Sequence, residues 1–146
     1  MRDLPRQLTR EELSELFEGD TALVRRLAET EYPLANAQHV IAGLTEAEKL
    51  EALNAHPAIG QRKGLSARSA AEQGADADPA VLEELGRLNA EYEAKFGFRF
   101  VVFVNRRPKA EILEVLRGRI TRTRAQELDT AVEELVAIAE DRWRRR

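Results

Sequence analysis

The stretch that decides the fold runs from residue 78 to residue 104 and reads DPAVLEELGRLNAEYEAKFGFRFVVFV. Asp78 followed by Pro79 is typical of a helix N-cap and first helical turn, and the apolar residues that follow recur at helical spacing. The pattern therefore predicts a helix from Pro79 to about Lys95. Its apolar stripe comprises Val81, Leu82, Leu85, Leu88, Tyr92 and Phe96.

A β-prone run follows this helix and consists of Phe100, Val101, Val102, Phe103 and Val104. No second strand is evident in the sequence to pair with it. We therefore expect this run to be buried, as extended chain or as helix.

Helix-start signals recur on both sides of this stretch. Thr9 precedes Glu12 at the spacing of a capping box, which predicts a helix to about Gly19. Thr45 and Glu48 repeat the same spacing. Further helices are expected to start at Asp20, Ser66, Pro108 and Thr123.

Length and helix content together predict the fold class. With 146 residues, 43% of them hydrophobic, the chain is long enough for one core and too short to expect two domains. Six to eight helices with at most one extended run predict an all-α bundle that forms a single domain over residues 1–146.

Composition excludes several classes of function. The net charge is -3, with basic and acidic residues mixed along the chain, so no basic field favours nucleic acid as a partner. The absence of cysteine removes disulfides, thiol nucleophiles and thiolate metal sites. No apolar stretch approaches the roughly 20 residues that span a bilayer, and the first ten residues lack the apolar stretch of a signal peptide. We expect a cytoplasmic protein without a membrane partner.

His56 is the first candidate for chemistry. The chain has two histidines, and His39 lies in an ordinary helical stretch. His56 stands before Pro57, which restricts its backbone and ends the preceding helix, and a loop follows. Histidine suits proton transfer near neutral pH. From position alone, a functional histidine and a surface or capping histidine are equally good interpretations.

Three polar side chains are expected to share one face of the short helix that starts at Ser66. They are Ser69, Glu72 and Gln73. A solvated helix explains them equally well, but paired with His56, Glu72 would form a carboxylate–imidazole unit. The sequence has no histidine pair at metal spacing and no phosphate-binding glycine loop. Acid–base chemistry without metal or cofactor is what remains.

Arg142 lies on the apolar stripe of the last predicted helix, four positions after Ile138. This position directs a cation toward the core side. The alternative, which the sequence by itself favours, is an arginine that extends to solvent at a helix C-terminus. Asn89 similarly lies on the buried side of its helix, as a structural amide or as part of a site.

Taken together, these segments resemble the 2-oxo-4-hydroxy-4-carboxy-5-ureidoimidazoline (OHCU) decarboxylase family. The order and approximate spacing agree over about the last two thirds of the chain. The matching residues are His56 and Pro57 with Ile59 and Gly60, then Ser69, Glu72 and Gln73, then Leu88, Asn89, Tyr92, Lys95, Phe96, Gly97, Phe98, Phe100 and Val101, and lastly Arg119 and Glu127 to Arg142.

The resemblance implies an all-α homodimeric enzyme that decarboxylates a small molecule, OHCU, to (S)-allantoin without a cofactor, in the last step of urate conversion. It also implies that His56 is the catalytic proton donor and that Arg142 reaches the site with it. We add the hypothesis that Glu72 polarises the substrate hydroxyl or orients His56. The residues implied to contact substrate are Pro57, Ser69, Gln73, Phe100, Val101, Val102, Phe103, Val104 and Arg119.

Two alternatives remain open at this point. A hydrolase of a related cyclic ureide would use His56 and Glu72 to activate water instead of protonating carbon. A non-catalytic helical interaction module would carry these residues incidentally.

The sequence departs from the family pattern at three places. Arg99 stands where the family usually has proline, and Arg122 stands where asparagine is common. The stretch between Gln73 and Leu88 is somewhat short. We expect these departures to alter the rim of the site and not its reaction.

Overall fold

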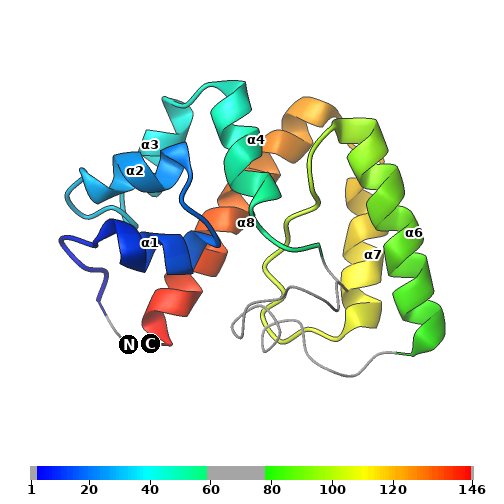
Figure 1. Cartoon of the computed structure of the whole chain (residues 1–146). Coiled ribbons are helices and arrows are strands. Elements are labelled where there is room, and N and C mark those ends of the chain that lie inside the picture. The colour runs from blue at the N-terminus through cyan, green and yellow to red at the C-terminus, as the bar shows by residue number, and fades with distance from the viewer. Residues whose placement is uncertain (1–2, 59–77, 146) are drawn as a thin grey trace. The chain divides into compact units, whose positions relative to one another are not determined.

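The computed structural model describes residues 3–58 and 78–145, and within these ranges the chain forms seven α-helices and no strand (Figure 1). The prediction of an all-α fold is confirmed. The helices are α1 (Arg10–Phe17), α2 (Ala22–Ala28), α3 (Ala37–Ala42), α4 (Glu46–Asn54), α6 (Pro79–Phe96), α7 (Lys109–Arg119) and α8 (Arg124–Arg144). The short helix expected from Ser66 lies outside the described residues.

The chain divides into two compact units. The first unit comprises residues 1–56 and 132–146, and the second comprises residues 57–131. Helix α8 therefore begins in the second unit and ends in the first. A single domain over the whole chain stays a prediction.

Both predicted capping boxes are present. The Thr9 hydroxyl accepts from the backbone N–H of Glu12 at 3.1 Å, and the Glu12 carboxylate accepts from the N–H of Thr9 at 3.0 Å. Thr45 and Glu48 make the same reciprocal pair at 3.1 and 2.9 Å. Each box satisfies two N–H groups that a helix start would leave without partners.

The start of α2 differs from the prediction. Thr21, not Asp20, caps this helix, because its hydroxyl accepts from the N–H of Val24 at 3.3 Å. The Asp20 carboxylate accepts from Arg10 Nε at 2.7 Å instead. Because the Asp20 side chain is paired with Arg10, the N-cap of α2 is the next residue, Thr21.

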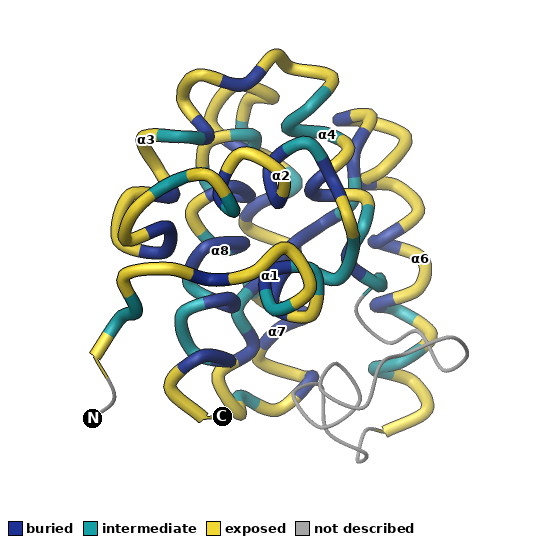
Figure 2. Tube along the Cα trace, turned by 60° about the vertical axis from the view of Figure 1, so that its left-hand side comes forward, coloured by how far each residue is buried: buried dark blue, intermediate teal, exposed yellow. Residues whose placement is uncertain are grey.

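The core of the first unit is built by short amphipathic helices. Helix α2 packs against α1, α3 and α4. Figure 2 shows buried positions recurring along these helices between exposed ones. The buried residues include Leu13, Leu16, Phe17, Leu23, Val24, Leu27, Leu53, Leu135, Ala139 and Trp143.

The core of the second unit lies between α6 and α7 and contains a group of aromatic rings. The Tyr92 ring lies 4.6 Å from that of Phe96, 5.9 Å from that of Phe98 and 5.2 Å from that of Phe100, between centroids. Such tilted and edge contacts are favourable beyond the burial of area alone. The apolar stripe predicted for α6 is buried at Leu85, Leu88, Tyr92 and Phe96 and half-buried at Val81 and Leu82.

Two features at the end of α6 direct the chain onward. Gly97 ends the helix with φ of 79°, a left-handed conformation that glycine adopts without steric cost. The run from Phe100 to Val104 is then neither helix nor strand, and four of its five residues are buried, with Phe103 half-buried. Its predicted burial is confirmed.

Among the described residues, no helix has both the length and the apolar character needed to cross a bilayer.

Candidate active site

His56 is the last residue of the first segment of the first unit, residues 1–56. Helix α4 ends at Asn54, and the backbone N–H of His56 donates to the carbonyl of Leu53 at 3.2 Å in a final tight turn. His56 is 5% exposed, whereas His39 on α3 is exposed. Pro57, the next residue, is half-buried. The interpretation of His56 as a surface histidine is therefore wrong, and its predicted place outside the helix, just after the end of α4, is confirmed. The loop expected to follow lies, from Ile59 on, outside the described residues.

Arg142 is a buried cation of the same unit and is 2% exposed. Its Nη1 donates to the carbonyl of Leu16 at 3.1 Å and to that of Glu15 at 3.4 Å, both at the C-terminal end of α1. Its Nη2 lies 3.1 Å from Glu18 Oε1. The alternative of an arginine extended into solvent is wrong, because these acceptors from α1 hold the guanidinium inside the unit.

Arginine side chains hold the buried run of the second unit by its carbonyl groups. Arg119 Nη1 donates to the Val101 carbonyl at 2.8 Å. Arg107 Nη2 donates to the Phe103 carbonyl at 2.6 Å, and its Nε donates to the Val104 carbonyl at 3.1 Å. These contacts fix a segment that has no helix or sheet ladder to hold it.

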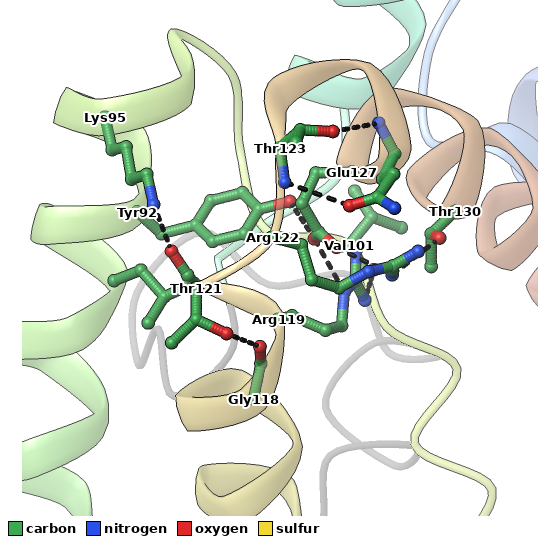
Figure 3. Close-up of polar contacts among 12 residues, drawn as sticks. Tyr92, Lys95, Val101, Gly118, Arg119, Thr121, Arg122, Thr123, Glu127 and Thr130 are labelled. Atoms are coloured by element: carbon green, nitrogen blue, oxygen red, sulfur yellow. Dashed lines mark hydrogen bonds and ion pairs between the residues drawn. The ribbon is translucent and has the colours of Figure 1, made fainter.

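Arg119 in turn belongs to a buried polar cluster around Glu127 (Figure 3). Glu127 Oε1 accepts from Arg119 Nε at 2.8 Å and from the Tyr92 hydroxyl at 2.6 Å, and Glu127 Oε2 accepts from Arg122 Nη1 at 2.9 Å. Burial, together with the hydrogen bond to Glu127, raises the pKa of Tyr92 well above its ordinary value. The phenol therefore remains a neutral donor.

Glu127 is the residue to which sequence reasoning gave no role. The resemblance includes its position, but the apolar stripe that the sequence predicts for the last helix, through Leu128, Val132, Leu135 and Ile138, does not. In the structure Glu127 has no exposed surface and Leu128 is half-buried. Two signals could have identified it: Glu127 precedes the buried Ala131 by four residues, and Tyr92 on a buried stripe needs an acceptor for its hydroxyl.

The remaining candidates fall into two groups. Asn89 is buried on α6, as its position predicted. Ser69, Glu72 and Gln73 lie outside the described residues, so the structure does not test the pairing of Glu72 with His56. Within the second unit the structure brings Arg119 together with the run from Phe100 to Val104, and the first unit holds His56 and Arg142.

The sequence profile of the OHCU decarboxylase family matches residues 2–144 of the chain. The chain belongs to the OHCU decarboxylase family. This family member is similar to an OHCU decarboxylase of Halalkalicoccus jeotgali, with 35% identity over 99 residues, which are 65% of this chain and 56% of that protein. It is also similar to the uric acid degradation bifunctional protein TTL of Arabidopsis thaliana, with 35% identity over 62% of this chain and 31% of that protein.

Solved structures agree with this assignment. A crystal structure of an OHCU decarboxylase in the presence of (S)-allantoin matches with a TM-score of 0.76 and 25% identity, covering 90% of this chain and 94% of that one. An (S)-allantoin synthase matches with a TM-score of 0.70 and 25% identity, over 91% of this chain and 47% of the other. The matched region spans about half the length of the archaeal relative and about a third of the plant one.

Proposed function

We propose that this chain catalyses the cofactor-free decarboxylation of OHCU to (S)-allantoin in urate breakdown. The family match over residues 2–144 carries this proposal. It is supported by the similarity to an OHCU decarboxylase structure determined in the presence of (S)-allantoin. A buried histidine on a restricted joint is consistent with the proton transfer that this reaction requires.

The substrate itself makes a cofactor unnecessary. When the bond between the ring carbon and the carboxylate breaks, carbon dioxide leaves and the electron pair moves into the adjacent ring C=N. The electron pair forms a C=C bond to the neighbouring carbon, which carries the ureido group, and the former C=N nitrogen takes a proton. The protein must orient the ring and add one proton to one face of that neighbouring carbon, while the hydroxyl on the decarboxylated carbon loses its proton and becomes the ring carbonyl. The face that receives the proton determines which enantiomer of allantoin forms.

Three residues carry the chemistry in this proposal. His56 donates the proton to carbon, and Glu72 orients His56 or polarises the substrate hydroxyl. Arg142 binds anionic or carbonyl oxygens of the substrate. Its contact with Glu18 at 3.1 Å supports a fixed guanidinium and not a mobile one.

A second set of residues binds the substrate. It comprises Pro57, Ser69, Gln73, Arg119 and the backbone from Phe100 to Val104. The carbonyl groups of Val101, Phe103 and Val104 accept arginine donors. Because these carbonyl groups already accept hydrogen bonds, the backbone N–H groups of the run are the donors expected to bind the carbonyl oxygens of the ureide. We further propose that the enzyme acts in the cytoplasm as a homodimer.

The proposal is tested by turnover of freshly prepared OHCU, which decays unaided, with released carbon dioxide trapped and the chirality of allantoin followed by circular dichroism. Wild-type protein is expected to form (S)-allantoin faster than the spontaneous reaction. His56→Gln should lower kcat by at least about 100-fold, the usual contribution of a positioned proton donor. The matched control is His39→Gln, which changes the exposed histidine and should retain full activity.

Two outcomes would contradict the proposal. A folded His56→Gln variant with wild-type turnover would remove His56 from the mechanism. Wild-type protein that consumes a cyclic ureide without releasing carbon dioxide would assign the site to hydrolysis instead.

A further inference from the structure

Glu127 is a carboxylate with no exposed surface and three side-chain donors. A buried carboxylate is tolerated only where hydrogen bonds and opposite charge replace its lost hydration. Glu127 obtains both from Arg119 and Arg122, and a further hydrogen bond from Tyr92. Its position in the first turn of α8 adds the favourable field of a helix N-terminus.

The two arginines that donate to Glu127 differ in their second hydrogen-bond partner. Arg122 is partly exposed, with 38% of its side chain accessible, and its second contact is with the Thr130 hydroxyl at 2.9 Å. Arg119 is buried, and its second contact is with the Val101 carbonyl at 2.8 Å. Of the two arginines bound to Glu127, only Arg119 contacts the backbone of the run from Phe100 to Val104, whereas Tyr92 reaches the run through its ring, which packs on that of Phe100.

The planar guanidinium of Arg119 links the Glu127 carboxylate to the backbone of that run. Its Nε is bound to Glu127 and its Nη1 to Val101, so one rigid group joins the two acceptors. The same guanidinium carbon lies 4.6 Å from the centroid of the Phe100 ring. Its Nη2 is buried and has no hydrogen-bond partner among the described residues. The two shared acceptors therefore set the orientation of the Arg119 fork.

We propose that Glu127 is a positioning residue for substrate binding, which acts through Arg119 to fix the backbone at Phe100 and Val101. The inference rests on the proposed function, because it gives Arg119 its role within the substrate-binding set. Glu127 and Tyr92 touch no substrate in this scheme. Their role is to keep the binding backbone in one conformation.

Kinetics distinguish positioning from a purely structural role. Contacts of the run with the substrate ring persist from the ground state to the transition state, so their loss raises KM and leaves kcat nearly unchanged. Glu127→Gln and Arg119→Lys are each expected to raise KM on the order of tenfold, with kcat changed less than about threefold. A merely structural residue would lower the unfolding temperature and leave KM unchanged.

The experiment measures three properties of the full chain in each variant: KM and kcat on OHCU well below the unfolding temperature, the unfolding temperature, and amide hydrogen exchange of residues 100–104. Thr130→Val is the matched control, because it removes a hydroxyl that accepts only from Arg122 among the contacts given above and leaves Glu127, Arg119 and Val101 unchanged. This control should keep wild-type KM and exchange. If Glu127→Gln does not fold, Arg119→Lys carries the test, since it keeps the positive charge but lacks the fork.

Raised KM together with faster exchange of residues 100–104 in the test variants, and neither change in Thr130→Val, supports the proposal. Unchanged KM in folded variants overturns it, as does an equal effect of Thr130→Val. If wild-type protein does not decarboxylate OHCU, the proposed function fails by itself. The positioning of the run is then judged on hydrogen exchange alone, and unchanged exchange overturns it.

Discussion

Two buried arginines show how single residues keep a charge inside this protein. Arg119 is paired with the fully buried carboxylate of Glu127, whereas Arg142 uses the carbonyl groups at the end of α1 and the carboxylate of Glu18. A guanidinium removed from water loses several kcal/mol of hydration, so each of these acceptors is needed for folding as well as for orientation. Substitution at either arginine therefore has a cost in stability.

Arg142→Ala is expected to lower the free energy of unfolding by about 2–3 kcal/mol, because it removes a buried ion pair and the donors at the end of α1. Urea denaturation followed by circular dichroism measures this change. The matched control is Arg144→Ala, which breaks a partly exposed pair with Glu140 on the same helix and should cost less than about 0.5 kcal/mol. Equal losses in the two variants would contradict the structural role of Arg142.

Tyr92 predicts an alkaline limit to stability. Its pKa is raised in the folded state, by burial first and by the hydrogen bond to Glu127 second, above the value of 10.0 that applies to the unfolded chain. The contribution of protonated Tyr92 to the free energy of unfolding is therefore complete below about pH 10. It is lost as the pH rises further, because the unfolded state releases the phenol proton first.

We expect the difference in unfolding free energy between wild type and Tyr92→Phe to narrow as the pH increases from 9 to 11. Urea titrations at fixed pH values measure it. Tyr32→Phe, at the exposed tyrosine, serves as the control and should parallel wild type throughout. A difference for Tyr92→Phe that stays constant over this range would exclude a raised pKa for Tyr92.

At the scale of elements, cationic side chains from distant parts of the chain bind the C-terminal ends of several helices. Arg124 Nε donates to the Phe96 carbonyl at the end of α6 at 2.9 Å, and Lys95 Nζ donates to the Ile120 carbonyl beyond α7 at 2.5 Å. A cationic side chain at a helix C-terminus donates to the free carbonyl groups and interacts favourably with the negative end of the helix dipole. The end of α6 is thus set by Gly97 and by a charge from α8.

Gly86 within α6 and Gly97, the C-cap that follows it, provide a matched pair of substitutions with opposite expected signs. Gly97→Ala should lower stability by about 1 kcal/mol, because φ of 79° is unfavourable for a residue with a Cβ. Gly86→Ala, at an exposed helical position, should raise it by about 0.5–1 kcal/mol. An added Cβ meets no atom within 4 Å at either site, so backbone conformation alone sets the sign. Thermal and urea unfolding of both variants test this pair.

At the scale of the whole molecule, α8 supplies residues to both compact units. Its first turn contributes Glu127 to the second unit, and its last turns contribute Arg142 to the first. One helix therefore carries a residue of the positioning cluster and a residue of the proposed catalytic set.

The proposed homodimer is tested at this scale. Light scattering after size exclusion should give twice the mass of the 146-residue chain, and the mass should be independent of concentration over the micromolar range. A mass equal to one chain at all concentrations would show that the homodimer is not formed. The activity of the same fractions shows whether the proposed reaction needs more than one chain.

The sequence by itself determined the features that depend on neighbours a few residues apart. The two capping boxes, the buried stripe of α6 and the joint at His56 all follow from spacings within one or two helical turns, where backbone geometry decides which side chains meet. The cap of α2 was the exception, because the partner that engages Asp20 is Arg10 on the preceding helix.

Tertiary structure decided the partners of the buried polar groups. Tyr92 and Glu127 are 35 residues apart, and Arg142 binds a carbonyl 126 residues away. No local spacing encodes such pairs, since the same residue types are equally suited to a solvated surface. Folding selects between the two states, because a buried charge is stable only where the packed chain places its acceptors around it.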